Sequence, residues 1–499
     1  MATLRNQTGG HVVQRRTSKR VRACVLALVI VACQILFSET SWGQKKPKES
    51  AGQKHIFSGP APAHPFDIVL ARPTDTSITA SVMIARESHG YLAYGLSINE
   101  LALKTPVLKL LPGMPVEFML KDLAPDTAYH YRLHYRESST SDFVASKNYS
   151  FHTQRKAGSP FVFTIQADSH LDQGTRPAVY ERTLANSLTD ATDFHVDLGD
   201  TFMTDKYPNY VDSLPQYIAQ RYYLGLAGCS APVFLVAGNH DGERLDRYNG
   251  TPNCMPVWAA MTRRKYFPPP IPNSFYTGSS TEVKHAGRPE NYFAFEWGDA
   301  QLIALDPFWT TARKGKGANE GNWSRTLGQV QYQWLAKTLA ASKARYKFVF
   351  IHHLVGGLDE SARGGTEAAV LYEWGGKGKD GKDEFKARRP GWAMPIHQLL
   401  VKHKVAAVFH GHDHFFARQE LDDIAYVMVP QPGHAGFDRL RNVDEYGYIR
   451  GDFLPPSGHV RVSVATDKAT VAYVRAYLPQ VETAQRKNGE VGYTFNIRR

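Results

Sequence analysis

The stretch VAAVFHGHDH, residues 405–414, holds the pattern that decides the fold. A short apolar run stops abruptly at a polar cluster, and this cluster has histidine at three alternate positions. Five further stretches follow the same plan: FVFTIQADSH (161–170), DFHVDLGD (193–200), VFLVAGNH (233–240), LIALDPF (302–308) and YKFVFIHH (346–353). Such apolar runs are typical of strands that are buried on both faces, in sheets covered by helices.

Segments able to form helices lie between several of these strands, for example at 176–189 and 328–343. In the second segment, Val330, Leu335 and Leu339 recur at helical spacing and indicate one apolar face. Helices between strands predict an α/β fold, in which chemistry collects at the carboxyl ends of the strands.

A hairpin and two long loops complete this part of the chain. The tail HVRVSVATDKATVAYVRAYL, 459–478, predicts a hairpin that closes one edge of a sheet. Residues 242–292 and 356–392 show little periodicity, and we expect them to form loops over the active face.

Residues 57–155 follow a different pattern, with alternation of period two. Ile78, Ala80, Val82 and Ile84 alternate with polar residues, as do the tyrosines of AYHYRLHYR, 128–136. Short turns with Pro, Asp or Gly separate these runs, which predicts an antiparallel β-sandwich with the tyrosines in its core rather than on a ligand-stacking face. The turn and strand LAPDTAYHYRL, 123–133, resemble those of fibronectin-type-III-like domains, including the domain that precedes the catalytic domain of purple acid phosphatases.

The first 43 residues are typical of an export signal. A basic stretch ends at Arg22, residues 24–37 carry no charge, and Ser41 and Gly43 fit the −3 and −1 positions of a cleavage site. A membrane span needs roughly 20 apolar residues, so a permanent anchor fits less well. We therefore expect a protein that is secreted or periplasmic.

Two other export routes and a linker belong to the same region. Arg15 and Arg16 could form a twin-arginine signal, and Cys33 could be a lipoprotein cleavage site. Residues 44–56 are polar and rich in lysine, which predicts a flexible linker.

The charge and cysteine content limit the classes of function. The formal net charge is +12, and the chain after residue 43 retains 53 basic and 46 acidic residues, a net of +7. This modest excess favours anionic substrates weakly and lacks the clustered stripe of a nucleic-acid binder. In an oxidising compartment, Cys229 and Cys254 would form one disulfide or stay as two buried thiols, and the sequence does not decide between them.

Metal-binding side chains gather at the ends of the apolar strands. The strand ends present Asp168 and His170, then Asp200, then Asn239, His240 and Asp241, then His352 and His353, and last His412, Asp413 and His414. Residues two apart on an extended chain point the same way, so each D-x-H or H-x-H pair could reach one common point. Carboxylate, imidazole and amide ligands without thiolate suit Mn, Fe, Zn or Ni and argue against a structural cysteine-zinc site. The candidates outnumber the ligands of one ion, so two ions sharing a carboxylate would use them well.

The order of these strand-end motifs resembles that of the calcineurin-like metallophosphoesterases over residues 160–415. The motifs are D-x-H, G-D, G-N-H-D, a single His after a strand, and G-H-x-H. The resemblance implies an α/β domain over 160–480, with two sheets flanked by helices. It also implies two divalent or trivalent ions, with Fe, Mn or Zn favoured. Asp168, His170, Asp200 and His414 would hold one ion, and Asp200, Asn239, His352 and His412 the other.

Two positions depart from the purple acid phosphatases within this resemblance. Those enzymes supply a tyrosinate three residues after the shared aspartate, where this chain has Met203, and they lack the histidine that is His170 here. We therefore expect a colourless relative. His353 and His410 are expected to support the site, whereas Asp413 should point away from it.

The resemblance also implies a reaction. Two cations about 3.5–4 Å apart can hold a hydroxide that attacks phosphorus in line with the leaving group. His240 follows Asn239 directly and is the expected general acid, with Asp205 or Asp241 behind it. The expected function is hydrolysis of phosphate mono- or diesters, and the motifs leave the choice between them open.

Two other readings remain open at this point. The first is a mononuclear zinc hydrolase of another bond type, and the second is a non-catalytic surface binding protein. Arg363, Arg388 and Arg389 are either phosphate clamps or solvated loop charges. The expected partner is a small phosphoester rather than a specific nucleic acid, and membrane contact is expected only through the signal or a lipid anchor.

Overall fold

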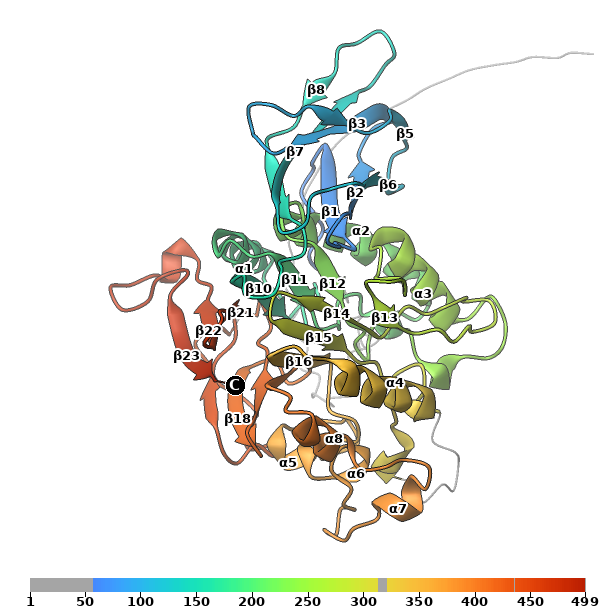
Figure 1. Cartoon of the computed structure of the whole chain (residues 1–499), viewed down its shortest axis with the longest axis vertical. Helices are drawn as coiled ribbons and strands as arrows, with labels where there is room; N and C mark the ends of the chain where they lie inside the picture. Colours follow the sequence, from blue (N-terminus) through green and yellow to red (C-terminus); the bar gives the residue numbers. More distant parts are fainter. Residues whose placement is uncertain (1–56, 313–320, 435, 499) are drawn as a thin grey trace, which may run out of the picture. The chain divides into compact units, whose positions relative to one another are not determined.

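An all-β region is followed by two larger sheets and their helices in the computed structural model, which describes residues 57–312, 321–434 and 436–498 (Figure 1). The predicted signal and linker therefore lie outside the described residues. Among the described residues, no helix combines the length and the apolar character that a membrane span requires.

The N-terminal region is an antiparallel sandwich, as the alternating pattern predicts. One sheet contains β1 (Phe66–Ala71), β2 (Ile78–Ile84) and β6 (Val116–Leu120). The other contains β3 (Ser88–Gly95), β4 (Leu103–Lys104), β5 (Leu108–Leu110), β7 (Ala128–Arg136), β8 (Val144–Ala145) and β9 (Tyr149–His152). Tyr129 and Tyr131 are buried with Leu and Ile side chains between the sheets. The tyrosines thus form core, and the ligand-stacking alternative is wrong.

The first of the larger sheets is mixed. Its strands, in spatial order, are β12 (Val233–Leu235), β11 (Phe194–Asp197), β10 (Phe161–Gln166), β21 (Gly458–Val464), β22 (Ala469–Arg475) and β23 (Val491–Ile497). Strands β10, β11 and β12 are parallel, and the hairpin β21–β22 pairs antiparallel to β10. The hairpin was expected at the sheet edge, but β23 pairs outside it and takes that place. Strand β23 was not predicted because polar residues and glycine interrupt its sequence, which therefore contains no apolar run.

The second large sheet carries the remaining strand-end motifs. Its order is β13 (Thr277–Gly278), β14 (Phe293–Trp297), β15 (Ala300–Ala304), β16 (Tyr346–Ile351), β17 (Ala407–His410), β19 (Ile424–Met428), β18 (Phe416–Leu421) and β20 (Asp452–Leu454). Strands β15, β16, β17 and β19 are parallel. The two large sheets share one apolar core, in which the Phe163 ring lies 5.1 Å from Phe194 and 5.6 Å from Phe348. This two-sheet architecture confirms the expected fold class.

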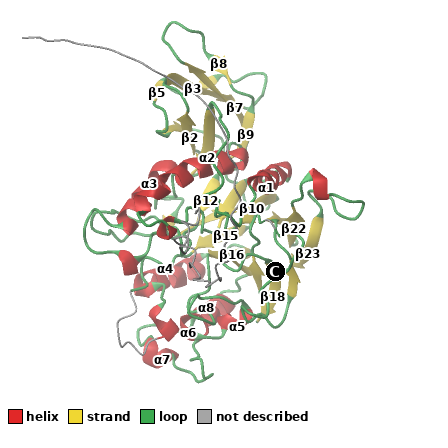
Figure 2. Cartoon of the chain, turned by 180° about the vertical axis from the view of Figure 1, so that it is seen from behind, coloured by secondary structure: helices red, strands yellow, loops and turns green. Residues whose placement is uncertain are grey.

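Helices flank the two sheets (Figure 2). They are α1 (Pro177–Thr189), α2 (Leu214–Gly228), α3 (Met255–Tyr266), α4 (Gly328–Ala341), α5 (Thr366–Ala369), α6 (Tyr372–Gly375), α7 (Phe385–Arg388) and α8 (Ile396–Lys402). Short 3-10 turns are η1 (Thr204–Lys206), η2 (Tyr210–Ser213), η3 (Leu245–Arg247), η4 (Gly321–Ser324) and η5 (Pro479–Val481). Helices α1, α2 and α3 each have proline in the first turn, where its missing N–H costs no hydrogen bond.

Two helix predictions hold and two loop predictions fail. Helices α1 and α4 occupy the segments predicted at 176–189 and 328–343. The segment 242–292 contains α3, and 356–392 contains the short helices α5 to α7, so neither is a plain loop. The apolar residues of α3 are consecutive at its start and its charged residues are confined to its last turn, so its sequence shows no helical period, and its buried face is set by packing against α2 and η3.

Cys229 and Cys254 are free thiols in this structure, so the disulfide alternative is wrong. Cys229 packs into the core of the N-terminal sandwich, whereas Cys254 packs in a separate cluster with Trp309. Their thiols instead donate to the carbonyls of Leu226 and Thr251.

Candidate metal centre

All seven predicted ligand residues follow a strand at its carboxyl end. Asp168 and His170 follow β10, and Asp200 follows β11, while Asn239 follows β12. In the second large sheet, His352 follows β16, and His412 and His414 follow β17. Six of them form two groups that could each hold an ion: the first group is Asp168, His170 and His414, and the second group is Asp200, His352 and His412.

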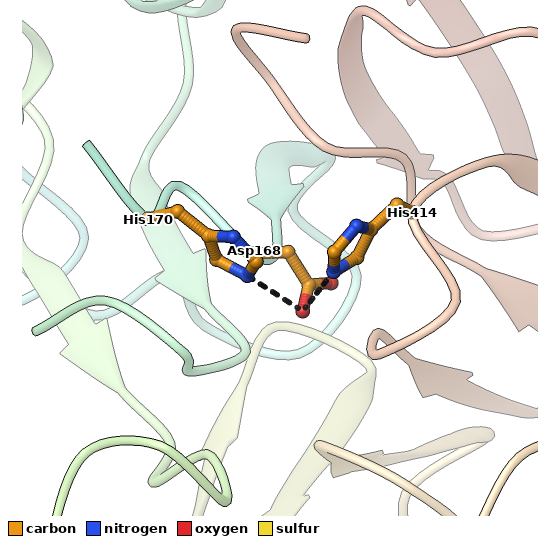
Figure 3. Close-up of side chains that lie close together, drawn as sticks. All are labelled: Asp168, His170 and His414. Atoms are coloured by element: carbon orange, nitrogen blue, oxygen red, sulfur yellow. Dashed lines mark ion pairs between the residues drawn. The ribbon is translucent and has the colours of Figure 1, made fainter. Parts of the chain in front are cut away.

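The first group converges on one carboxylate oxygen (Figure 3). Asp168 Oδ1 lies 3.7 Å from His170 Nε2 and 3.5 Å from His414 Nε2. Both Asp168 Oδ1 and His170 Nε2 are buried without a hydrogen-bond partner. Such orphaned polar atoms are costly, and a cation between them would satisfy both, so the residues fit a metal ion.

A second carboxylate supports His170 from behind. Asp172 Oδ2 lies 3.4 Å from Nδ1 of His170, on the side of the ring away from Asp168. Burial opposes protonation of this ring, but the two carboxylates outweigh it and raise the pKa of His170 to about 10. The strong attraction for positive charge is what a cation site requires.

The second group is organised by backbone carbonyls. His352 Nδ1 donates to the Leu198 carbonyl at 2.8 Å, and His412 Nε2 donates to the Ser361 carbonyl at 2.7 Å. The opposite nitrogens, His352 Nε2 and His412 Nδ1, then face each other at 3.2 Å. Hydrogen bonds of this kind fix the ring orientation of metal-binding histidines.

Oxygen ligands complete the second group. His352 Nε2 lies 3.2 Å from Asp200 Oδ2 and 3.0 Å from the Asn239 amide oxygen. Burial, followed by the neighbouring His352, lowers the pKa of His412 to about 3, so its imidazole is neutral. For His352, burial is outweighed by the Asp200 carboxylate, which raises its pKa to about 9. Ligand atoms from four residues thus meet where a cation would sit, and the cation would replace the proton on His352 Nε2.

The two groups are neighbours joined by direct contacts. The backbone N–H of His412 in the second group donates to Asp168 Oδ2 in the first, at 2.8 Å. From helix α2, the Gln220 amide donates to Ser169 Oγ at 2.8 Å and to the Thr201 carbonyl at 3.0 Å. This helix therefore fastens the loops after β10 and β11 to each other.

Five of the ligand candidates have left-handed backbone conformations. The φ angles are 59° at Asp168, 51° at His170, 55° at Asp200, 83° at His412 and 67° at His414. The expectation of extended chain at the two alternating pairs is therefore wrong. Asp168 and His170 still meet, but the turn at His412 and His414 sends these side chains to different groups. Left-handed conformation is uncommon outside glycine and costs about 1–3 kcal/mol per residue.

His240 lies beside the second group and has one carboxylate partner. Its Nδ1 lies 2.8 Å from Asp205 Oδ1, and the other oxygen of Asp205 accepts from Arg244 at 3.3 Å. Its backbone N–H donates to Asp200 Oδ1 at 2.7 Å. Of the two carboxylates expected behind His240, the structure selects Asp205.

Asp241 has a scaffold role instead. Its carboxylate accepts the backbone N–H groups of Gly238, Asp200, Thr201 and Phe202 at 2.7–3.0 Å. Burial and the nearby Asp200 raise its pKa to about 7. A side chain at Gly238 would overlap the Asp200 backbone, so glycine is needed for this close approach.

A cavity of about 610 Å³ opens over the second group. Its walls include His240, His353, Asn239 and His412, with Phe308 as an aromatic side. Its basic residues are Lys206, Arg244, Arg325 and Arg363, and its acidic residues are Asp246 and Glu360. Of the arginines considered from the sequence, only Arg363 lines it.

The other two arginines do not line the cavity, so neither is a phosphate clamp there, and two cavity arginines were not predicted from the sequence. Arg389 pairs with Glu373 at 2.5 Å, and Arg388 pairs with Glu384 at 3.3 Å. Arg244 follows His240 by four residues, so its position beside a predicted site residue could have indicated it. Arg325 has no predicted site residue near it in the sequence.

Three further histidine-motif residues have separate roles. His353 is buried at the cavity wall, where the Phe308 ring lies 5.2 Å away edge-on. Asp413 accepts from the Gly364 backbone at 3.0 Å and from the Tyr448 hydroxyl at 2.8 Å, and it belongs to neither group. His410 is buried, and burial lowers its pKa to about 3.

The comparisons with known proteins agree with this architecture. PhoD has a similar structure, with a TM-score of 0.59 and 15% identity over 83% of this chain and 88% of PhoD. The purple acid phosphatase PPD1 from yellow lupin (Lupinus luteus) seeds has a TM-score of 0.56 and 16% identity, over 88% of this chain and 74% of its own. At such identities the likeness shows the fold alone, and no curated protein matches the sequence.

The sequence of the region that forms the two large sheets shows the family to which the chain belongs. The model of the calcineurin-like phosphoesterases matches residues 161–416, from the start of β10 to the start of β18. This span covers half of the chain and contains both groups, His240 and the walls of the cavity. The chain therefore belongs to the calcineurin-like phosphoesterase family.

Proposed function

We propose that this chain is an exported phosphoesterase that depends on two metal ions and hydrolyses phosphate mono- or diesters. The observation that carries the proposal is the placement of His240, backed by Asp205, beside two adjacent metal-binding groups. Asp200 connects these parts, since one oxygen accepts from the His240 backbone and the other faces His352. Two groups rather than one argue against a mononuclear hydrolase.

The donor set favours Fe, Mn or Zn. The two groups offer only imidazole and carboxylate, with the amide oxygen of Asn239 beside the second. We propose Asp200 as the shared ligand of both ions. When bound, the ions would supply positive charge for the phosphate oxygens and a nucleophile at neutral pH.

His240 would supply the proton for the leaving group. Asp205 holds Nδ1 of the ring, which leaves Nε2 as the proton-carrying atom for the substrate. The Arg244 guanidinium on the other oxygen of Asp205 fixes the carboxylate in turn. The His240 ring stays close to the second group because Asn239, the residue before it, is part of the second group's surroundings.

The test is a His240→Ala variant, assayed on esters with good and poor leaving groups. A general acid contributes about 100- to 10,000-fold, so hydrolysis of an alkyl phosphate should fall by that factor. Hydrolysis of p-nitrophenyl phosphate should fall much less, because nitrophenolate leaves without a proton. An equal loss on both esters would refute the acid role, and no hydrolysis of any phosphoester by protein loaded with Fe, Mn or Zn would refute the function.

Export and partners belong to the same proposal. We propose that residues 1–43 direct the chain to the periplasm or out of the cell, and that the partner is a small phosphoester. Amino-terminal sequencing of the mature protein from the periplasm or medium should begin at Gln44. Full-length protein retained in the cytosol would contradict export.

A further inference from the structure

Arg325 lies in the cavity wall between η4 and α4 and is held by three oxygen atoms. Its Nη1 donates to the Asn322 amide oxygen at 2.9 Å and to the Gly356 carbonyl at 3.4 Å. Its Nη2 donates to the Glu360 carbonyl. A guanidinium has five N–H groups, so its orientation is fixed while two donors remain for a ligand.

Among the residues that the structure describes, Arg325 has no ion-pair partner. Arg244 pairs with Asp246 at 2.8 Å and with Asp205 at 3.3 Å, and Arg363 pairs with a carboxylate of its own loop at 3.5 Å. Within the described ranges, no carboxylate lies within ion-pair distance of Arg325 or Lys206. Lys206 is exposed, whereas Arg325 is half-buried, and burial lowers the pKa of its guanidinium.

One loop connects Arg325 to the second group. The Glu360 carbonyl accepts from Arg325, and the next carbonyl, of Ser361, accepts from His412 Nε2 at 2.7 Å. Arg325, His353 and the candidate metal ligand His412 all line this cavity. A ligand that reaches the second group through this cavity passes the Arg325 guanidinium, which hydrogen bonds hold in place and which has no ion-pair partner among the described residues.

The size of the cavity indicates more than a phosphate ion. Its volume of about 610 Å³ falls in the range of sites for organic ligands, about 300–1,000 Å³. Phe308 and Pro307 give one part of the wall an apolar surface. The remainder of the substrate would thus contact both apolar surface and the Arg325 cation.

We propose that Arg325 binds a second anionic group on the organic part of the substrate, a carboxylate or a further phosphate. The inference rests on the proposed phosphoesterase function and adds a substrate class: organic phosphoesters with an additional negative charge. Arg325 is then a specificity-determining residue, and its fork geometry matches carboxylate and phosphate oxygens in a way that a lysine cannot reproduce.

The experiment compares two substrates with the same carbon skeleton, 3-phosphoglycerate and glycerol 3-phosphate. They differ by a carboxylate in place of a hydroxymethyl group. For the metal-loaded parent, kcat/KM should favour 3-phosphoglycerate by about tenfold or more, the effect of a hydrogen bond to a charged group. In Arg325→Gln this ratio should approach one, and in Arg325→Lys it should take an intermediate value.

A matched control and a binding measurement separate the explanations. Arg388→Gln removes an arginine outside the cavity and should keep the parent ratio. If the Arg325 variants acted only by disturbing the loop at Gly356 and Glu360, kcat/KM would fall equally for both substrates. The ratio of the two kcat/KM values would then stay at the parent value, and this result would overturn the inference. Calorimetry then compares binding of both compounds to the metal-loaded proteins. Tenfold selectivity that depends on Arg325 without any hydrolysis would refute only the phosphoesterase function, whereas equal or absent binding would overturn the inference.

Discussion

In the second group, His352 and His412 each donate to a backbone carbonyl, of Leu198 and of Ser361. In the first group, His170 is backed by the side chain of Asp172, and the side chain of His414 is 37% exposed. Backbone partners are set by the fold, whereas side-chain partners depend on their own rotamers. The second group is therefore preorganised by the sheets, and the first group relies more on its carboxylates and on the ion.

The largest effect should come from Asp200→Asn, which tests whether the two groups act as one site. The change removes the charge beside His352 and places a donor against either this ring or the His240 N–H. We expect a loss of about 1,000-fold in kcat/KM, equivalent to about 4 kcal/mol. Metal analysis should show loss of ions from both groups.

Asp168→Asn is the matched change in the first group. It should remove about one ion per chain and leave the other, since Asp168 contacts only His170 and His414 among the imidazoles of the two groups. A protein with Asp200→Asn that keeps both ions and the parent rate would show that Asp200 is not shared.

A chelator should have the next largest effect. Loss of a ligand present at 100 times its Kd lowers the free energy of unfolding by about 2.7 kcal/mol. We expect the first group to account for most of it, because Asp168 Oδ1 and His170 Nε2 are buried without protein partners. Denaturant titrations with and without chelator measure the shift. The loss of unfolding free energy caused by the chelator should be smaller in His170→Ala than in His412→Ala. An equal loss in the two variants would show that the two groups contribute equally to stability.

Asp172→Asn should have the smallest effect and should be confined to the first group. Loss of a carboxylate behind a metal-binding histidine weakens metal affinity by about 10- to 100-fold. Competition with a fluorescent chelator should show this loss for one ion only. Asp190→Asn, which breaks a similar pair with the remote His459 at 2.7 Å, is the control and should leave both affinities unchanged. If Asp172→Asn weakened the affinity for both ions, Asp172 would not support the first group alone.

The strand-end residues could be predicted because their signal is local. A buried strand followed at once by Asp, Asn or His needs no knowledge of distant parts of the chain, and Asp168, Asp200 and His352 all follow this rule. The assignment of ligands to groups came from the family resemblance rather than from spacing. Left-handed turns at His412 and His414 redirect these side chains, and the alternating pattern does not reveal them.

Other features depend on contacts between distant segments. Asp205, rather than Asp241, contacts the His240 ring because of the turn that begins at Met203. Met203 also has a left-handed backbone conformation. In α4 the apolar pattern placed Val330 on the buried face, yet its exposed fraction is 57%, while Gln331 is buried. Gln331 faces inward because its amide donates to the Asp306 carbonyl and accepts from the Asp306 N–H. Such polar tertiary contacts have no signature in hydrophobic periodicity.

The left-handed conformations at five ligand candidates have a consequence for how long the protein survives in the presence of proteases. Each holds the chain in a conformation that it would leave if the loops opened. Ions bound to the two groups would oppose this opening, so copies without metal would expose these segments to proteases more often. Proteolysis would remove unloaded copies first, and the steady-state amount of the protein would follow the supply of metal.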